Sequence, residues 1–194
     1  MGRSSHGNVC RVAHHLDARQ VKELEKLAAD EPVTDSPNGL PVHADEYAEI
    51  LEVVSPIKRR WLGPAFHFPK EIPAYSHEVV LITHENIGLL DPTFLDWMPA
   101  VGKRDPVCLL VHEGQGASIC YSPAISELAH EAGVETHSAY RGQGFAAPVV
   151  AAWASAVRKL GIEPLYSTST DNLRSQSVAA KLGLVAIGLD FHLS

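Results

Sequence analysis

A basic, glycine-rich turn that leads directly into a long apolar helix constrains this chain more than any other feature. Residues 133–146 read Gly-Val-Glu-Thr-His-Ser-Ala-Tyr-Arg-Gly-Gln-Gly-Phe-Ala, an extended run that ends in the turn. Gly142 and Gly144 let the backbone approach a ligand, and the N–H groups of the first helical turn attract an anion. Arg141 brings a fixed positive charge and a fork of donors suited to phosphate. The segment therefore predicts a site for a phosphate-bearing cofactor.

The pattern around this turn predicts an α/β fold. Two apolar strands flank Glu113-Gly114-Gln115-Gly116, which is typical of a hairpin, and helices alternate with strands after the turn. The expected elements are strands over 107–112 and 117–121, an extended run over 130–136, a helix over 145–160, a strand over 165–169, a helix capped by Asn172 and a closing strand over 184–192. This order is typical of an α/β domain.

The N-terminal half predicts helices and an aromatic loop. We expect helices over 17–29, capped by Asp17, and over 45–54, a strand over 78–84, and a short helix from Asp91-Pro92 to Trp97. Residues 55–75 carry four prolines among four aromatic side chains and predict a loop rather than a regular element. This loop either lines a substrate pocket or is a packed connector.

Length and composition indicate one domain with a core of its own. The 194 residues are 45% hydrophobic, so we expect a single domain over residues 1–194. The three cysteines favour buried thiols at Cys108 and Cys120 over a disulfide, and no apolar run is long enough to span a membrane. A cytoplasmic location is the resulting expectation.

The charge distribution argues against nucleic acid as the main partner. The formal net charge is −7, yet residues 141–194 hold five basic and three acidic side chains. This imbalance suits an anionic cofactor at one end and a cationic substrate at the other, and scattered surface charge explains it equally well.

The glycine turn has two short-motif interpretations besides a general anion site. A Walker loop is disfavoured because no Gly-Lys-Ser/Thr follows. The run Gly142-x-Gly144-x-x-Ala147 matches a dinucleotide fingerprint, but about 50 residues follow it, too few for the rest of a doubly wound sheet.

A third interpretation accounts for more residues. Arg141-Gly142-Gln143-Gly144-Phe145-Ala146 resembles the Q/R-x-x-G-x-G/A signature of the GNAT (Gcn5-related N-acetyltransferase) superfamily. The run from Asn172-Leu173-Arg174-Ser175 to Ala179-Ala180-Lys181-Leu182-Gly183-Leu184 resembles the second signature of that superfamily. The resemblance covers about residues 106–194, and residues 1–105 would then help to shape the acceptor site.

The resemblance implies a central mixed sheet flanked by helices, with acetyl-CoA bound between two splaying strands of that sheet. The backbone of Val134, Glu135 and Thr136 would pair with the pantetheine arm. The pyrophosphate would lie at the turn, on Arg141, Gly142, Gln143, Gly144, Phe145 and Ala146. Asn172 would contact the pantetheine or serve as a plain helix cap, and Ser175 is a further cofactor candidate with a structural alternative.

Glutamates on the strand before the turn are the candidates for the catalytic base. Several relatives place a catalytic glutamate near the position of Glu131, ten residues before Arg141, and Glu135 is the second choice. By alternation Glu131, Gly133, Glu135 and His137 share a face. Carboxylates on a central strand are costly unless they are solvated or paired, which favours a polar cleft here. The alternative is an exposed or salt-bridged glutamate.

One departure from the superfamily pattern concerns the general acid. Many relatives carry a tyrosine seven residues after the asparagine, where this chain has Ala179. Tyr166 on the neighbouring strand or a water molecule would take that role, and Tyr166 is otherwise a core residue. The eleven histidines show no ligand spacing, so no metal is expected.

The resemblance implies transfer of an acetyl group from acetyl-CoA to a primary amine, with a small molecule as the expected acceptor. A protein or peptide amine is the alternative among enzymes. A non-catalytic acyl-CoA-binding module is the alternative outside them. A homodimer is common among relatives.

Overall fold

The computed structural model describes residues 1–33, 39–90 and 92–194. The chain forms two compact units, each drawn from several segments. The first unit contains residues Met1–Ala65, Ser167–Leu173 and Ala186–Ser194, and the second contains Phe66–Tyr166 and Arg174–Val185. The cofactor-binding strand and turn expected from the sequence both lie in the second unit.

The second unit contains the expected mixed sheet. Its strands are β4 (Val79–Ile82), β5 (Val107–His112), β6 (Gln115–Ile125), β7 (Ala129–Thr136) and β8 (Glu163–Ser167), in the order β8-β7-β6-β5-β4. Neighbouring strands are antiparallel except β7 and β8, which run parallel. The predicted fold class, an α/β fold with a mixed sheet flanked by helices, is confirmed.

The hairpin between β5 and β6 forms as predicted, with a two-residue turn. His112 pairs with Gln115, so that Glu113 and Gly114 make the connection. Both have positive φ, 51° and 77°, which is the type I′ geometry that matches the twist of antiparallel strands.

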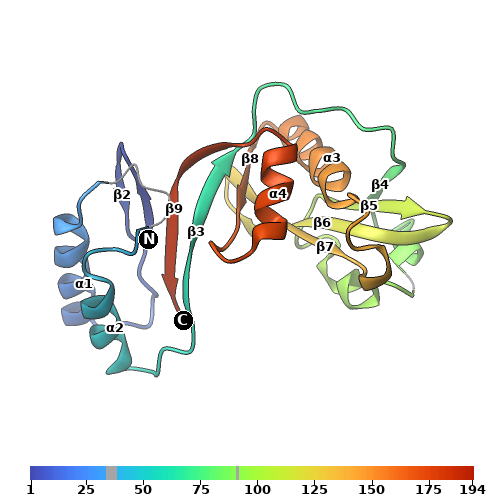
Figure 1. Cartoon of the computed structure of the whole chain (residues 1–194). Coiled ribbons are helices and arrows are strands. Elements are labelled where there is room, and N and C mark those ends of the chain that lie inside the picture. Colours follow the sequence, from blue (N-terminus) through green and yellow to red (C-terminus); the bar gives the residue numbers. More distant parts are fainter. Residues whose placement is uncertain (34–38, 91) are drawn as a thin grey trace. The chain divides into compact units, whose positions relative to one another are not determined.

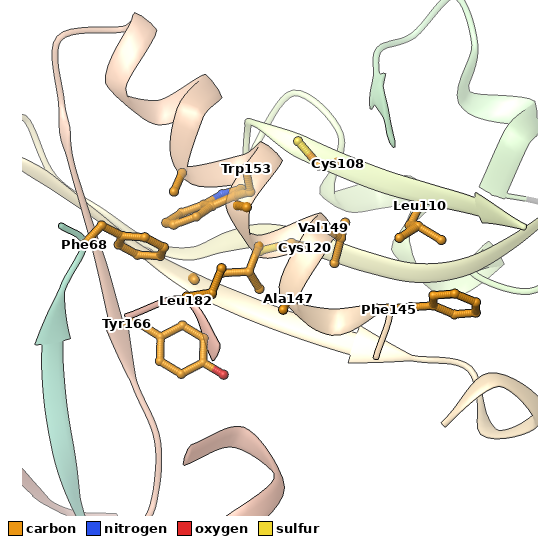
Figure 2. Packing of buried hydrophobic residues seen from close by; sticks show 14 of the residues in the cluster. Phe68, Cys108, Leu110, Cys120, Phe145, Ala147, Val149, Trp153, Tyr166 and Leu182 are labelled. Carbon is orange, nitrogen blue, oxygen red and sulfur yellow. The ribbon is translucent and has the colours of Figure 1, made fainter. Parts of the chain in front are cut away.

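One face of this sheet packs against α3 (Ala146–Lys159), which crosses β5, β6 and β7 (Figure 1). Figure 2 shows the core of this layer, in which Val149 and Trp153 of the helix meet Cys108 of β5 and Cys120 of β6. Both cysteines are free and buried, as predicted, and burial raises the pKa of each thiol. They lie directly opposite each other in the ladder.

The other face packs against two short 3-10 helices, η1 (Ile87–Leu90) and η2 (Leu95–Ala100). Alternate residues of β5 pack on opposite faces of the sheet, since Val107 and Leu109 belong to this second cluster and Cys108 to the first. The expected helix from Asp91 to Trp97 is wrong in its bounds: Asp91 lies outside the described residues, and Trp97 lies in the middle of η2.

Helix α4 (Leu173–Lys181) begins directly after Asn172, as the sequence predicts. Its Ala179, together with Leu182 just beyond its end, joins the α3 core. Tyr166 near the end of β8 packs in the same cluster (Figure 2). Its hydroxyl lies 2.6 Å from the Ser175 hydroxyl of α4. The second sequence signature therefore contributes directly to this core.

The first unit combines strands from both ends of the chain with two helices. The strands are β1 (Gly2–Ser4), β2 (Gly7–Val9), β3 (Arg60–His67) and β9 (Val185–Leu193), in the order β2-β1-β9-β3. The helices are α1 (Ala18–Asp30) and α2 (Ala44–Glu52). Asp17 caps α1 as predicted, and with Gln20 it forms a capping box in which each side chain accepts a hydrogen bond from the other's backbone N–H.

Strand β3 corrects the prediction that residues 55–75 form a loop throughout. The carbonyls of Leu62 and Pro64 accept hydrogen bonds from Thr170 and Thr168, so the missing N–H of Pro64 does not break the pairing. A side chain on Gly63 would meet the carbonyl oxygen of Thr168 at 1.8 Å, so glycine permits this close approach. The number of prolines suggested a loop, but in these two hydrogen bonds residues 62 and 64 act only as carbonyl acceptors, a role that proline can fill.

A buried ion pair organises the first unit. Arg3 on β1 lies 2.9 Å from the Glu31 carboxylate, and both residues are buried. The same carboxylate accepts hydrogen bonds from the backbone N–H groups of Val42 and His43, and Arg3 also donates to the carbonyl of Gly39. Glu31 thus joins the end of α1, the strand β1 and the segment that leads into α2.

None of the helices in the described part of the chain combines the length and the apolar character needed to cross a membrane.

We expect Glu31→Gln to destabilise the first unit strongly, because it leaves the buried Arg3 guanidinium without its counter-charge. Breaking a buried pair costs about 3–5 kcal/mol in the free energy of unfolding. Urea unfolding followed by circular dichroism measures the loss. Glu23→Gln is the matched control, since its exposed pair with Arg19 contributes about 0.5 kcal/mol or less. Equal effects of the two substitutions would contradict the structural role of Glu31.

Candidate functional site

The candidate site is built on β7, the turn that follows it and the start of α3, all within the second unit. Ala132 and Val134 of β7 face the α3 core. The alternate residues Gly133 and Glu135 contact Tyr121 and Trp97, which belong to the opposite face. The predicted alternation of β7 is therefore confirmed for Gly133 and Glu135.

Strands β7 and β8 pair over a short stretch and then part. The paired residues are Ala129 with Glu163, His130 with Pro164 and Glu131 with Leu165. Beyond Glu131, none of the described residues of β8 pairs with β7. The backbone of residues 132–136 therefore has no strand partner on this side in the described structure, although its amide groups need hydrogen-bond partners. Such an edge inside a sheet can accept an extended ligand.

The glycine turn opens the backbone toward the N-terminus of α3. Gly142 and Gly144 have φ values of 83° and 88°, and a β-carbon at either position would meet no atom within 4 Å. Phe145 is the N-cap residue and makes no side-chain capping bond. Because Pro148 has no N–H, the first turn of α3 presents the N–H groups of Ala146 and Ala147. This is the geometry of an anion site at a helix N-terminus.

Arg141 lies at the root of the turn and is exposed. Its Nε donates to the carbonyl of Thr136 at 3.2 Å, which ties the guanidinium to the end of β7. Gln143 donates to the carbonyl of Ala139 at 3.5 Å. The turn therefore combines a fixed positive charge with an open backbone, as the sequence predicts.

A cluster of aromatic and imidazole rings supports the turn, and sequence reasoning missed it. The buried Phe145 ring has its centroid 4.8 Å from that of His112, 5.7 Å from that of His77 and 6.2 Å from that of Tyr140. The Tyr140 hydroxyl donates to Gln115 on the β5–β6 hairpin at 3.1 Å. These contacts link the turn to β5, to β6 and to His77 just before β4, which no local sequence pattern reveals.

A bulge in β6 lies opposite the point where β7 and β8 part. Tyr121 pairs with Gly133 and Ala124 with Glu131, so β6 has one more residue than β7 between these pairs. Buried Ser122 at the bulge accepts a hydrogen bond from Trp153 at 3.1 Å and lies 3.2 Å from the Nδ1 atom of His130. Burial lowers the pKa of His130, which favours the neutral imidazole in this network.

The two candidate bases occupy different surroundings. Glu131 is half-buried and lies on the last rung shared by β7 and β8. Glu135 is exposed, and its carboxylate accepts a hydrogen bond from the indole N–H of Trp97 at 3.1 Å. Trp97 in turn packs on Tyr121, with ring centroids 4.1 Å apart. The assignment of either carboxylate as the base stays a prediction.

The remaining predicted site residues are Tyr166, Asn172 and Ser175, which come after α3 in the chain. Tyr166 is 2% exposed, and burial raises its pKa to about 12. This environment agrees with the core role weighed as its alternative. Ser175 bonds to it, and Asn172 belongs to the first unit, where its N–H donates to the carbonyl of Ser169. The predicted contacts of Asn172 and Ser175 with the cofactor stay predictions.

In the described ranges, no three His, Cys, Asp or Glu side chains are grouped closely enough to hold a metal ion.

Comparisons with known proteins show what this part of the chain is similar to. Residues 107–188 match the family described as GNAT acetyltransferase. This segment contains β5–β8, the glycine turn, α3 and α4. No curated protein sequence matches the chain significantly.

Solved structures with the same fold come from several acetyltransferase-like proteins. A GCN5-related N-acetyltransferase-like protein from Streptococcus suis 89/1591 aligns with a TM-score of 0.55 at 21% identity, over 79% of this chain and 68% of that one. A protein assigned to the GNAT family from Novosphingobium aromaticivorans DSM 12444 aligns with a TM-score of 0.59 at 16% identity, over 71% of this chain and 65% of that one. A tandem GNAT protein from the clavulanic acid biosynthesis pathway aligns with a TM-score of 0.51 at 13% identity, over 94% of this chain and 73% of that one. The chain thus spans about two thirds of the first two structures.

The raised pKa of Tyr166 predicts a specific loss of stability at high pH. Below pH 10 the phenol is protonated in both states; between pH 10 and about 12 the unfolded chain loses this proton first, so the free energy of unfolding falls. We expect the decline between pH 9 and 11 to be shallower for Tyr166→Phe than for the wild type, by about 1 kcal/mol. Urea unfolding at several pH values measures it, and parallel curves would contradict the predicted shift.

Proposed function

Because residues 107–188 match the GNAT acetyltransferase family and the chain has the GNAT fold, we propose that this protein transfers the acetyl group of acetyl-CoA to a primary amine of a small molecule. The observation that carries the proposal is the parting of β7 from β8 beside an open anion-binding turn. An extended, phosphate-bearing cofactor can use both features, the free edge of β7 for its amide-bearing arm and the turn for its phosphates.

The residues present fit acetyl-CoA at both ends of its length. The backbone of Val134, Glu135 and Thr136 would pair with the amide-bearing pantetheine arm, because this side of β7 has no partner strand in the described residues. Arg141 and the N–H groups at the start of α3 would hold the pyrophosphate. Gly142 and Gly144 leave the space that the phosphates require.

Glu131 is the proposed base. Acetyl-CoA supplies an acetyl group activated as a thioester, and the amine must lose a proton before or during attack on it. Glu131 lies where β7 and β8 part, two residues from Gly133 on the same strand face. It would accept the amine proton, directly or through water. Glu135 is the second candidate for this role.

The proton for the departing thiolate comes from Tyr166 or from water. Ala179 occupies the position where many relatives carry a tyrosine, and it is buried in the core. Tyr166 has a hydroxyl group, yet its burial and its bond to Ser175 favour water as the proton source. The missing tyrosine also supports the second candidate function, a non-catalytic acyl-CoA-binding module.

We expect Gly144→Val to weaken acetyl-CoA binding at least tenfold in calorimetric titration. Its φ of 88° disfavours a β-branched residue, and the side chain would project toward the proposed phosphates. Gly114→Val is the matched control, because Gly114 also has positive φ and open space around it but lies in the β5–β6 hairpin. If both variants fold and bind acetyl-CoA with equal affinity, the cofactor does not bind at this turn.

Substitution of the proposed base separates the two candidate functions. Glu131→Gln should lower turnover about 100-fold or more while acetyl-CoA affinity stays unchanged. Release of the CoA thiol during incubation with a panel of primary amines measures turnover. Glu163→Gln, at the start of the same β7–β8 ladder, serves as the control. A wild-type protein that binds acetyl-CoA and acetylates none of the amines would instead support the binding module.

A further inference from the structure

An exposed carboxylate and two aromatic rings in close contact lie together on the sheet face opposite α3. Glu135 of β7 accepts a hydrogen bond from Trp97 of η2, and Trp97 packs on Tyr121 of β6. We propose that Trp97, Tyr121 and Glu135, here called the acidic–aromatic site, bind the acceptor. We further propose that the acceptor is a monocationic amine with an aromatic or extended apolar body. This inference rests on the proposed acetyl transfer, because it names the amine that the reaction consumes.

The charge of Glu135 calls for a cation. In the described parts of the chain, no lysine, arginine or histidine side chain lies within 4.0 Å of this carboxylate. The indole N–H of Trp97 holds its Oε2 atom at 3.1 Å and fixes its orientation without neutralising it. An alkylammonium group can form the missing charge-assisted hydrogen bond.

The aromatic rings supply the second part of the recognition. Trp97 and Tyr121 lie with centroids 4.1 Å apart and both are half-buried. An ammonium group is attracted to the face of an indole ring, and an apolar body gains from contact with the rings. A carboxylate beside an indole therefore favours a cation that carries apolar surface over a strongly hydrated, fully polar one.

The nearby Arg104 is the reason to propose an acceptor with only one positive charge. Its guanidinium carbon lies 5.8 Å from the centre of the Tyr121 ring. A second ammonium group on the ligand would approach this fixed charge and be repelled. The site therefore disfavours polyamines.

The position of the acidic–aromatic site suits the proposed reaction. Tyr121 lies directly over Gly133, where an added β-carbon would come within 2.7 Å of the ring, so glycine allows the ring to approach β7. Glu135 itself belongs to the β7 segment proposed to pair with the pantetheine arm, and Glu131 follows on the same face. An amine held here lies along the strand that carries both the proposed cofactor contacts and the proposed base, and proximity of this kind is what the transfer requires.

The test uses four probes that share or lack single features. 2-Phenylethylamine has one positive charge and an aromatic body, 2-phenylethanol lacks the charge, 3-phenylpropionate reverses it, and spermidine multiplies it. Saturation-transfer NMR and calorimetry measure binding to the whole protein in the presence of CoA, which keeps the reaction from proceeding. We expect 2-phenylethylamine to bind at least about fivefold more tightly than any of the other three.

Variants then assign the binding to these residues. Glu135→Gln and Trp97→Leu should each weaken 2-phenylethylamine binding about fivefold and raise its KM more than they lower kcat. Glu127→Gln is the matched control, because Glu127 is equally exposed but lies in the turn between β6 and β7. Thermal unfolding checks that all variants are folded.

The outcomes distinguish this inference from the proposed function. If acetyl-CoA binds but 2-phenylethylamine does not bind better than the alcohol, the carboxylate or spermidine, the inference is wrong and acetyl transfer can still stand. Unchanged amine affinity in folded Glu135→Gln protein would also overturn it. If acetyl-CoA itself does not bind, the proposed function fails, whatever the amine does.

Discussion

The packing of α3 against β5, β6 and β7 is the constraint on which the site depends. The helix axis is fixed by buried residues such as Val149, Val150 and Trp153, which are fully enclosed in the core. Because these contacts leave no freedom to rotate, the first turn of α3 and the glycines before it keep one orientation relative to β7. The same helix reaches the β6 bulge through the bond from Trp153 to Ser122, so one packing layer holds both the turn and the place where β7 and β8 part.

The local part of the site could be predicted from the sequence, because it is encoded in a continuous segment. The extended run, the basic turn, the two glycines and the apolar face of the following helix all lie within residues 130–160, and each has a short-range physical signal. The same holds for the hairpin at Glu113-Gly114 and for the Asp17 cap, where turn chemistry and capping decide the structure.

Features that depend on pairing between distant segments escaped prediction. Strand β3 looked like a loop because Pro64 and the prolines on either side of the strand dominate the local pattern, while its partners Thr168 and Thr170 lie about 100 residues later. The rings around Phe145 come from the segment before β4, from β5 and from the turn, and the contact of Trp97 with Glu135 joins residues 38 positions apart. Neither periodicity nor a motif reports such contacts, so the acidic–aromatic site became visible only in the folded chain.

The antiparallel pairing of β1 with β9 affects the order in which the protein can assemble during synthesis. Gly2 pairs with Asp190 and Arg3 with Leu189, so β1 cannot complete its pairing until β9 has been made. At translation rates of about 5–20 residues per second, the ribosome needs roughly 10–40 s to add the intervening residues. The second unit is largely continuous from Phe66 to Tyr166 and can condense in that interval. Throughout it, β1 can pair with β2 but lacks its other neighbour β9, so this edge of β1 is open to chaperones or to pairing with other nascent chains.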